Sequence, residues 1–327
     1  MKKILLLCSL FSSLFAQFSQ AFHYTLDSQP EATWQEESTM PFDELILSWN
    51  AIRPSSGRFG FLVSLRQNDA WSPWLYYAEW GAPGQILFRE NPPTSFAETR
   101  FGVAGPLKEN GKTKNLCTGF RVKVLTSGGA SLHALKSVGV SIARLSEFKI
   151  APVGDLSRVL FENVPRQSQI MLRHPRYTDL SMPTAMTVAL NYLRGNRDID
   201  GSDFAESVCD DDNLGYEDWV FNAAEGYNRI QREALVTRLP DFAALHASLL
   251  RGLPVLIGMK GSVTGGPRPF YREHTLCVIG YDPDQRKVHC IDTAFPNDRS
   301  TAVAYPLDDF LRVWATQRNI ACIFLEN

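Results

Sequence analysis

The spacing of apolar residues divides the chain into two halves. Between Phe42 and about Ala143, short apolar runs alternate with polar residues and are separated by Gly, Pro, Asn and Ser. Runs of this kind occupy residues 59–65, 86–88, 120–125 and 132–143. Short alternating strands with turn residues between them are typical of a β-sandwich. The first half is therefore predicted to be an all-β, sandwich-like domain.

The apolar period lengthens after residues 148–155, a segment with Pro and Gly that is predicted to be a linker. Residues 182–194 carry apolar side chains at helical spacing, with Pro183 in the first turn and Gly195 after the end. Further helices are predicted at 219–231, 241–251 and 307–315, and strands at 255–259, 275–281, 288–292, 301–305 and 320–325. Helices followed by an antiparallel sheet predict an α+β fold for this half. We expect a sandwich-like domain over residues 22–150 and an α+β domain over residues 151–327.

The first 21 residues have the pattern of a secretory signal peptide. Two lysines precede an apolar stretch at 4–16, and the small-x-small triplet at 19–21 fits a cleavage site. The apolar stretch is shorter than the roughly 20 residues that cross a bilayer as a helix. We expect cleavage after Ala21, a mature chain that starts at Phe22 without a stable membrane anchor, and export to the periplasm or the medium. An uncleaved anchor is the alternative.

Composition excludes some classes of partner and site. The formal net charge is −2, and the lysines and arginines are scattered, so a nucleic-acid-binding surface is not expected. Five cysteines follow the predicted signal without a C-x-x-C pair, which indicates neither a zinc site nor a dense disulfide framework. One disulfide among them stays open. The sequence implies no metal and no cofactor, and it leaves the oligomeric state open.

Five aromatic residues lie close together in the first half: Trp71, Trp74, Tyr76, Tyr77 and Trp80. Aromatic faces bury a large area at little cost in conformational entropy, so the group could bind sugar rings or peptide side chains. The alternative is that these residues fill the core of the sandwich.

A set of polar residues in the second half has the order of a nucleophilic site. Ser181 lies at the start of the predicted helix 182–194, where the helix dipole favours a developing anion. His274 starts one predicted strand and Asp292 ends the next. If these strands form a hairpin through the turn 282–286, Asp292 can reach His274 and orient its imidazole. Gln169, or else Gln167, is the candidate for stabilising an oxyanion.

Several short segments occur in an order that matches a known family. They are Val164–Gln169, Ser181–Thr184, Trp219–Ala224, Gly252–Val255, Glu273–His274 and Asp292–Ala294, with Ser48–Ala51 at the start of the first domain. In these segments the chain resembles the bacteriocin-processing-peptidase-like family (cysteine peptidase family thirty-nine-like) of the papain-like superfamily, in its exported branch. The resemblance implies a peptide or amide hydrolase with a Cys-His-Asp triad and a glutamine in the oxyanion hole.

The chain departs from the family pattern at two positions of the site. Ser181 stands where the family has its cysteine, and Glu273 stands where it has a small glycine. A cysteine pKa near 8.5 is lowered to about 4–7 beside a histidine and a helix end, which gives a standing thiolate. A serine hydroxyl is not ionised at rest and must lose its proton to a base during attack. We expect substrate contacts at Glu273 and Trp219.

Three hypotheses follow from the sequence. The favoured one is a catalytically impaired homologue of a papain-like peptidase that binds a peptide or protein in the retained cleft. The second is a working serine-dependent peptidase, amidase or acyl hydrolase that uses Ser181, His274 and Asp292. The third is a binding protein whose function lies in the aromatic-rich sandwich.

Overall fold

A computed structural model describes residues 18–26, 32–109, 112–113 and 115–326. The chain folds into two units. Unit 1 comprises residues up to Phe148 together with Asp210–Leu214, and unit 2 comprises Lys149–Cys209 and the chain from Gly215 onward. Residues 1–17 of the predicted signal peptide lie outside the described part of the chain.

Over its described residues, unit 1 contains two antiparallel six-stranded sheets and a short hairpin. The first sheet has the order β1-β14-β3-β10-β9-β8, with β1 Ser19–Thr25, β14 Leu135–Ala143, β3 Glu44–Ala51, β10 Val103–Pro106, β9 Ala97–Arg100 and β8 Arg89–Glu90. The second has the order β2-β13-β4-β6-β7, with β2 Thr33–Glu36, β13 Gly119–Ser127, β4 Arg58–Gln67, β6 Leu75–Gly81 and β7 Gly84–Leu87, and with β5 Ala70–Trp71 beside β4. The hairpin is β11 Lys108–Glu109 with β12 Lys112–Thr113.

The two sheets of unit 1 pack face to face through aromatic rings. The Trp49 ring of β3 stacks on the Phe61 ring of β4 with 4.0 Å between centroids. Trp80 and Tyr77 of β6 are fully buried in this core. Because these rings come from both sheets, burying them stabilises the sandwich predicted from the alternating pattern.

The five clustered aromatic residues do not share one surface. Tyr77 and Trp80 are in the core, whereas Tyr76 is exposed. Trp71 and Trp74 both face the guanidinium of Arg121, each at 4.7 Å from ring centroid to the guanidinium carbon. This arrangement already pairs two of the aromatic faces with a cation.

β1 bears on the predicted cleavage point. The strand pairs with β14 in an unbroken antiparallel register, in which Ser19 is opposite Ala143. Cleavage after Ala21 would shorten β1 from its N-terminal end. Among the described residues, no helix has the length and apolar character needed to cross a membrane.

A segment from the second half of the chain completes the edge of one sheet in unit 1. β7 is the last strand of its sheet, and its amides at Gln85 and Leu87 donate to the carboxylates of Asp211 and Asp210, at 2.8 and 2.9 Å. Asp211 also donates its own amide to the Gln85 carbonyl. Edge strands with free amides are prone to unwanted pairing, and the two carboxylates occupy these amides.

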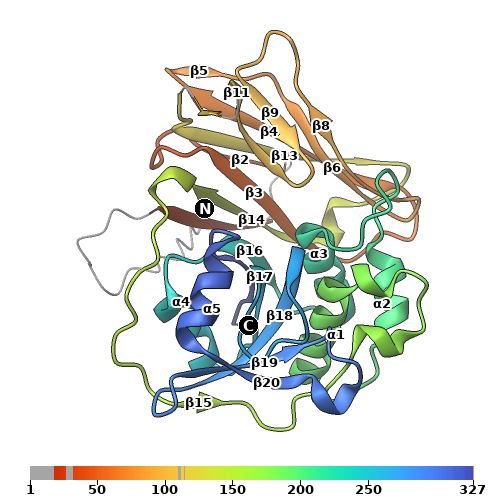
Figure 1. Cartoon of the computed structure of the whole chain (residues 1–327). Helices are drawn as coiled ribbons and strands as arrows, with labels where there is room; N and C mark the ends of the chain where they lie inside the picture. Colours follow the sequence, from red (N-terminus) through yellow and green to blue (C-terminus); the bar gives the residue numbers. More distant parts are fainter. Residues whose placement is uncertain (1–17, 27–31, 110–111, 114, 327) are drawn as a thin grey trace. The chain divides into compact units, whose positions relative to one another are not determined.

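Unit 2 is built around one antiparallel sheet. Its order is β16-β21-β17-β18-β19-β20, with β16 Ala234–Arg238, β21 Ile320–Phe324, β17 Val255–Gly261, β18 Phe270–Asp282, β19 Lys287–Asp292 and β20 Ala302–Pro306, and with β15 Val159–Leu160 beside β18. The helices are α1 Ser181–Arg194, α2 Gly201–Val208, α3 Trp219–Ile230, α4 Phe242–Leu250 and α5 Leu307–Ala315. In Figure 1, α1, α2 and α3 lie on one side of the sheet, and α4 and α5 lie on the other.

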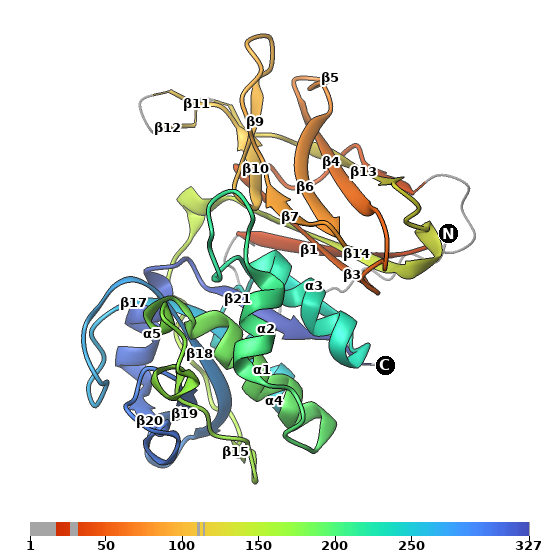
Figure 2. The same ribbon diagram turned by 90° about the vertical axis from the view of Figure 1, so that its right-hand side faces the viewer.

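Short 3-10 helices complete both units. They are η1 Leu132–Ala134, η2 Leu145–Glu147, η3 Gln169–Leu172, η4 Tyr177–Asp179 and η5 Asp298–Ser300. η1 occupies the start of the run 132–143, which was predicted to be strand throughout. The α+β fold is confirmed by the helices and antiparallel sheets (Figure 2).

Local signals explain where α1 and α4 begin and end. Every side chain of α1 from Ser181 to Asn191 is buried, so this helix lies in the core. Gly195 ends it in the left-handed conformation, with φ of 70°. Asp241 caps α4 by accepting from the amide of Ala244 at 2.8 Å. α2 and β16 are among the elements that were not predicted, and they have only 8 and 5 residues.

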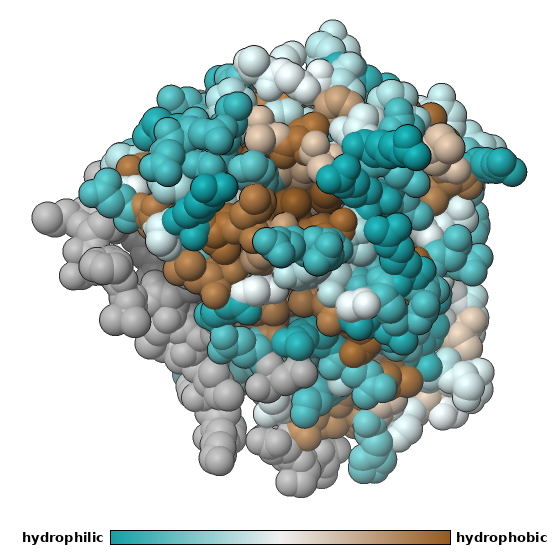
Figure 3. Space-filling model, turned by 90° about the horizontal axis from the view of Figure 1, so that it is seen from below, coloured by the Kyte–Doolittle hydropathy of each residue, from teal (hydrophilic) through white to brown (hydrophobic). Residues whose placement is uncertain are grey.

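The surface is not uniformly polar. Seen from below, apolar residues gather in one area that hydrophilic residues border (Figure 3). Large exposed apolar side chains also flank segments of the predicted site: Ile170 and Met171 in η3, Tyr177 in η4 and Tyr271 in β18. Exposed apolar groups of this kind are typical of surfaces that contact other molecules.

Candidate active site

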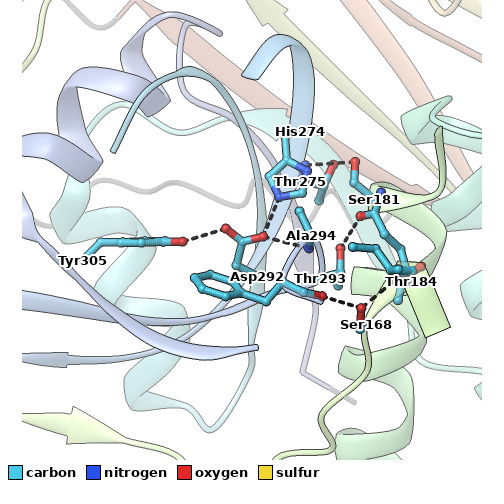
Figure 4. Close-up of polar contacts among 12 residues, drawn as sticks. Ser168, Ser181, Thr184, His274, Thr275, Asp292, Thr293, Ala294 and Tyr305 are labelled. Atoms are coloured by element: carbon cyan, nitrogen blue, oxygen red, sulfur yellow. Dashed lines mark hydrogen bonds and ion pairs between the residues drawn. The ribbon is translucent and has the colours of Figure 1, made fainter. Parts of the chain in front are cut away.

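Ser181 is the first residue of α1 and is buried. The preceding residue, Leu180, packs in a small apolar cluster with Ala205 and Tyr216, which fixes the start of the helix. The backbone amide of Thr275 donates to Ser181 Oγ at 3.2 Å. This bond joins the start of α1 to β18 (Figure 4).

His274 and Asp292 form a buried pair on neighbouring strands. β18 and β19 form the predicted hairpin, in which Asp292 lies opposite Leu276, two residues beyond His274 on the same face. His274 Nε2 and Asp292 Oδ1 are 2.8 Å apart. The imidazole also stacks on the Phe270 ring, with 3.9 Å between centroids and 2° between planes. The imidazole is thus contacted on one face by the Phe270 ring and at one nitrogen by Asp292.

Asp292 is held in turn by two further donors. The amide of Ala294 donates to Oδ1 at 3.0 Å, and the hydroxyl of Tyr305 donates to Oδ2 at 2.6 Å, as Figure 4 shows. Burial alone would raise the pKa of Asp292, but the charge of His274 and the hydrogen bonds from His274, Tyr305 and Ala294 lower it below its ordinary value. Asp292 is therefore a carboxylate suited to orient an imidazole.

Gln169 is tied to segments on both sides of the site. Its side-chain Nε2 donates to the carbonyl of Tyr177 and its Oε1 accepts from the hydroxyl of Thr293, both at 2.8 Å. Its backbone amide donates to the Thr293 carbonyl at 2.9 Å. Thr293 follows Asp292, and Tyr177 lies just before Ser181. Gln167, the alternative, instead has its amide group next to Gly201 at the start of α2.

Glu217 is a site residue that the sequence did not indicate. The Ser181 hydroxyl donates to Glu217 Oε1 at 2.6 Å, and the Ser181 backbone amide lies close enough to this carboxyl group to favour its charged form. No hydrogen bond joins the Ser181 hydroxyl to His274 in the part of the chain that the structure describes. Glu217 lies 36 residues from Ser181 in the sequence. The one sequence feature that could have pointed to Glu217 is its position two residues before Trp219, the first residue of the family-like segment Trp219–Ala224.

The surroundings of Glu217 favour its neutral form. Burial raises its pKa to about 8, and the hydrogen bond from the Ser181 hydroxyl opposes that rise. The negative charges of Glu273 and Asp179 raise the pKa further. At neutral pH the group next to Ser181 is therefore mostly a protonated carboxyl, which is a weak proton acceptor.

The two predicted substrate contacts, Glu273 and Trp219, contact each other. Trp219 Nε1 donates to Glu273 Oε1 at 2.5 Å, and the side-chain amide of Gln317 donates to Oε2. Burial raises the pKa of Glu273, whereas the bond from Trp219 and the charge of Arg238 lower it. Gly258 makes room for the pair, because a Cβ there would lie 3.0 Å from both side chains.

The described residues offer no cluster of three or more His, Cys, Asp or Glu side chains that could hold a metal ion. Cys117, Cys209, Cys277, Cys290 and Cys322 are all free thiols, so the disulfide left open by the sequence is not formed among them. Burial raises the pKa of Cys117 and of Cys322 to about 12, so these thiols are poor nucleophiles.

Comparison with known proteins identifies a family for the segment that contains these site residues. The model of the Peptidase_C39 like family matches residues 161–322. Residues 161–322 belong to the peptidase C39-like family. The family resemblance predicted from the sequence is thereby confirmed for these residues, and the exported branch and the similarity at Ser48–Ala51 stay predictions. Membership of this C39-like family indicates a papain-like hydrolase fold.

A solved structure also matches part of the chain. It is a crystal structure described as that of a C39-like peptidase from Bacillus anthracis, at 18% identity and a TM-score of 0.41, covering 53% of this chain and 99% of that one. No curated protein matches the chain. The C39-like segment contains Gln169, Ser181, Glu217, His274 and Asp292.

Proposed function

We propose that this chain is a catalytically impaired homologue of the papain-like hydrolases that binds a peptide or protein at the site around Ser181. The observation that carries the proposal is the direction of the Ser181 hydroxyl, which donates to Glu217. In a serine hydrolase the histidine must accept this proton during attack. With the proton held by a different group, His274 is not in place to start the reaction.

The chemistry of the nucleophile supports the same proposal. A thiol in such a site gives its proton to the histidine at rest, whereas a hydroxyl keeps its proton until attack and requires close contact with the base. The pKa of Glu217 is raised to about 8, so Glu217 does not act as a strong base for Ser181 at neutral pH. Neither His274 nor Glu217 then removes the proton of the Ser181 hydroxyl.

A peptide is the expected ligand because apolar and polar groups lie in the same segments. Met171, two residues after Gln169, is 56% exposed, and Tyr271, three residues before His274, is 84% exposed. Exposed side chains of this size bury much area when they contact a side chain of a ligand. Binding of a peptide library, followed by fluorescence polarisation, tests this, and unchanged affinity in Tyr271→Ala and Met171→Ala would argue against it.

The test of impairment is hydrolysis of a peptide and ester panel by three proteins: wild type, Ser181→Ala and Ser181→Cys. We expect the wild type and Ser181→Ala to give the same background rate. Turnover by the wild type that is lost in Ser181→Ala would overturn the proposal. Ser181→Cys shows whether a thiol alone restores the reaction.

A second candidate function is a working serine-dependent hydrolase, either a peptidase, an amidase or an acyl hydrolase. The intact pair of His274 and Asp292, 2.8 Å apart, favours it, because an oriented imidazole is costly to keep without use. This candidate requires the Ser181 hydroxyl to turn from Glu217 to His274 when substrate binds. The same panel decides it, since it predicts turnover that Ser181→Ala removes.

We also infer export, from the basic start, the short apolar stretch and the small residues at 19–21. Mass spectrometry of the mature protein from fractionated cells gives its first residue. A start at Phe22 supports cleavage after Ala21, and a start before Ser19 leaves β1 whole while still supporting export. A cytoplasmic protein that retains Met1 would contradict the inference.

A further inference from the structure

Glu217 holds the hydroxyl of Ser181 and lies beside its backbone amide at the start of α1. Its carboxyl group accepts from Ser181 Oγ at 2.6 Å, and the Ser181 backbone amide lies close enough to the same group to favour its charged form. In sites of this type, the amide of the nucleophile is one of the donors that stabilise the oxyanion. A carboxyl group of the chain itself therefore lies beside the donor that the carbonyl oxygen of a substrate would need.

The main chain on either side of Glu217 is fixed. Tyr216 is buried in the cluster with Leu180, the residue before Ser181. The side-chain amide of Asn222, which is fully buried, donates to the carbonyls of Tyr216 and Asp218, each at 2.9 Å. These carbonyls flank Glu217, so the main chain on both sides of it is held in place. The direction of its carboxyl group toward Ser181 therefore does not depend on a side-chain rotamer alone.

The face of Tyr216 is also covered. The guanidinium of Arg176 lies 4.9 Å from its ring centroid, and the ring of His174 packs edge-on at 5.3 Å. Arg176 is in turn bonded to Asp179, two residues before Ser181, at 3.0 Å. The loop that carries Glu217 and the turn that leads into Ser181 are thus joined by several contacts.

Resting on the proposed function, we propose that the Glu217 carboxyl group, bound to the Ser181 hydroxyl at 2.6 Å, occupies the site beside the Ser181 amide and is a second cause of its inactivity besides the serine itself. A substrate carbonyl cannot approach the Ser181 amide while the Glu217 carboxyl group lies beside it. The other donor, Gln169, has one of its two side-chain hydrogens bonded to Tyr177. Restoring the thiol is then insufficient, and the carboxyl group must also be removed.

The experiment compares Ser181→Cys, Ser181→Cys with Glu217→Ala, and Ser181→Cys with Glu225→Gln. Glu225 is a matched control, because it is another buried glutamate of the same region and bonds to Arg229 at 2.6 Å on α3. Two quantities are measured: the rate of peptide hydrolysis, and the rate of alkylation by iodoacetamide at position 181, followed by mass spectrometry at pH 6. Circular dichroism establishes that each variant is folded, and Glu217→Ser replaces Glu217→Ala if the latter does not fold.

Removing the Glu217 carboxyl group from Ser181→Cys should raise hydrolysis about 100-fold or more, since a single oxyanion donor contributes about 10²–10³ in kcat. Alkylation should rise as well, because a thiol freed from a neutral carboxyl group can give its proton to His274. The control should match Ser181→Cys in both rates. Equal alkylation and hydrolysis with and without the Glu217 carboxyl group would overturn the inference.

These outcomes are separable from those that test the proposed function. If the wild type hydrolyses substrate through Ser181, the proposed function fails, whatever the alkylation rates of the thiol variants are. If Glu217→Ala in the wild-type background removes such turnover, Glu217 takes part in the reaction and the inference of a blocking residue fails too. If the wild type is inactive and Ser181→Cys is fully active alone, only the inference fails.

Discussion

Replacing Glu217 by glutamine should change how the stability of unit 2 depends on pH. An unfolded glutamate loses its proton near pH 4.3, whereas folding raises the pKa of Glu217 to about 8. Between these values the folded state holds a proton that the unfolded state has released, so the free energy of unfolding falls as pH rises. This contribution is fully present below about pH 4.3 and is lost by about pH 8. At 1.36 kcal/mol for each pH unit, the loss amounts to about 5 kcal/mol.

The glutamine of Glu217→Gln keeps the size and the acceptor oxygen but does not titrate. Glu273 and Asp179, whose charges act on Glu217, are present in both proteins, so their own titration largely cancels in the difference. Relative to the variant, the wild type should lose up to about 5 kcal/mol between pH 4.3 and pH 8, which corresponds to roughly 10–20 °C in Tm for a unit of this size.

The assay is thermal unfolding of both proteins at constant ionic strength from pH 5 to pH 8.5, followed by circular dichroism. The result of interest is the difference between the two Tm values at each pH. A difference that stays constant over this range, or that grows in favour of the wild type as pH rises, would refute the assignment of a raised pKa to Glu217. It would also remove the argument that a neutral carboxyl group faces Ser181.

Two further substitutions test the packing of the site. Asp292→Asn should cost roughly 3–5 kcal/mol in urea unfolding, because it breaks a buried pair with His274; a loss below about 1 kcal/mol would contradict the pairing. Gly258→Ala should cost about 1–3 kcal/mol, since its Cβ would lie 2.7 Å from a methyl carbon of Ile320. Gly154→Ala is the control, because a Cβ at Gly154 has no neighbour within 4 Å, and equal costs at the two glycines would contradict the crowding.

Much of unit 2 could be predicted from local signals. The helix from Ser181 has a continuous apolar pattern and ends at Gly195, and both signals act within a few residues. The hairpin of β18 and β19 follows from two apolar runs with a short turn between them, and it places His274 and Asp292 on one face. These site residues were found because each lies at the end of a strongly patterned element.

The remaining contacts depend on segments that are distant in the sequence. The sequence by itself determined the α+β elements, the family segments and the positions of Ser181, His274 and Asp292, because periodicity and turn residues act locally. Only the tertiary structure decided that the Ser181 hydroxyl donates to Glu217, because this contact requires the packing of Leu180 against Tyr216 and the bonds of Asn222 to the main chain. A hydroxyl proton goes to the acceptor that the fold brings nearest, and no pattern along the chain records which acceptor that is.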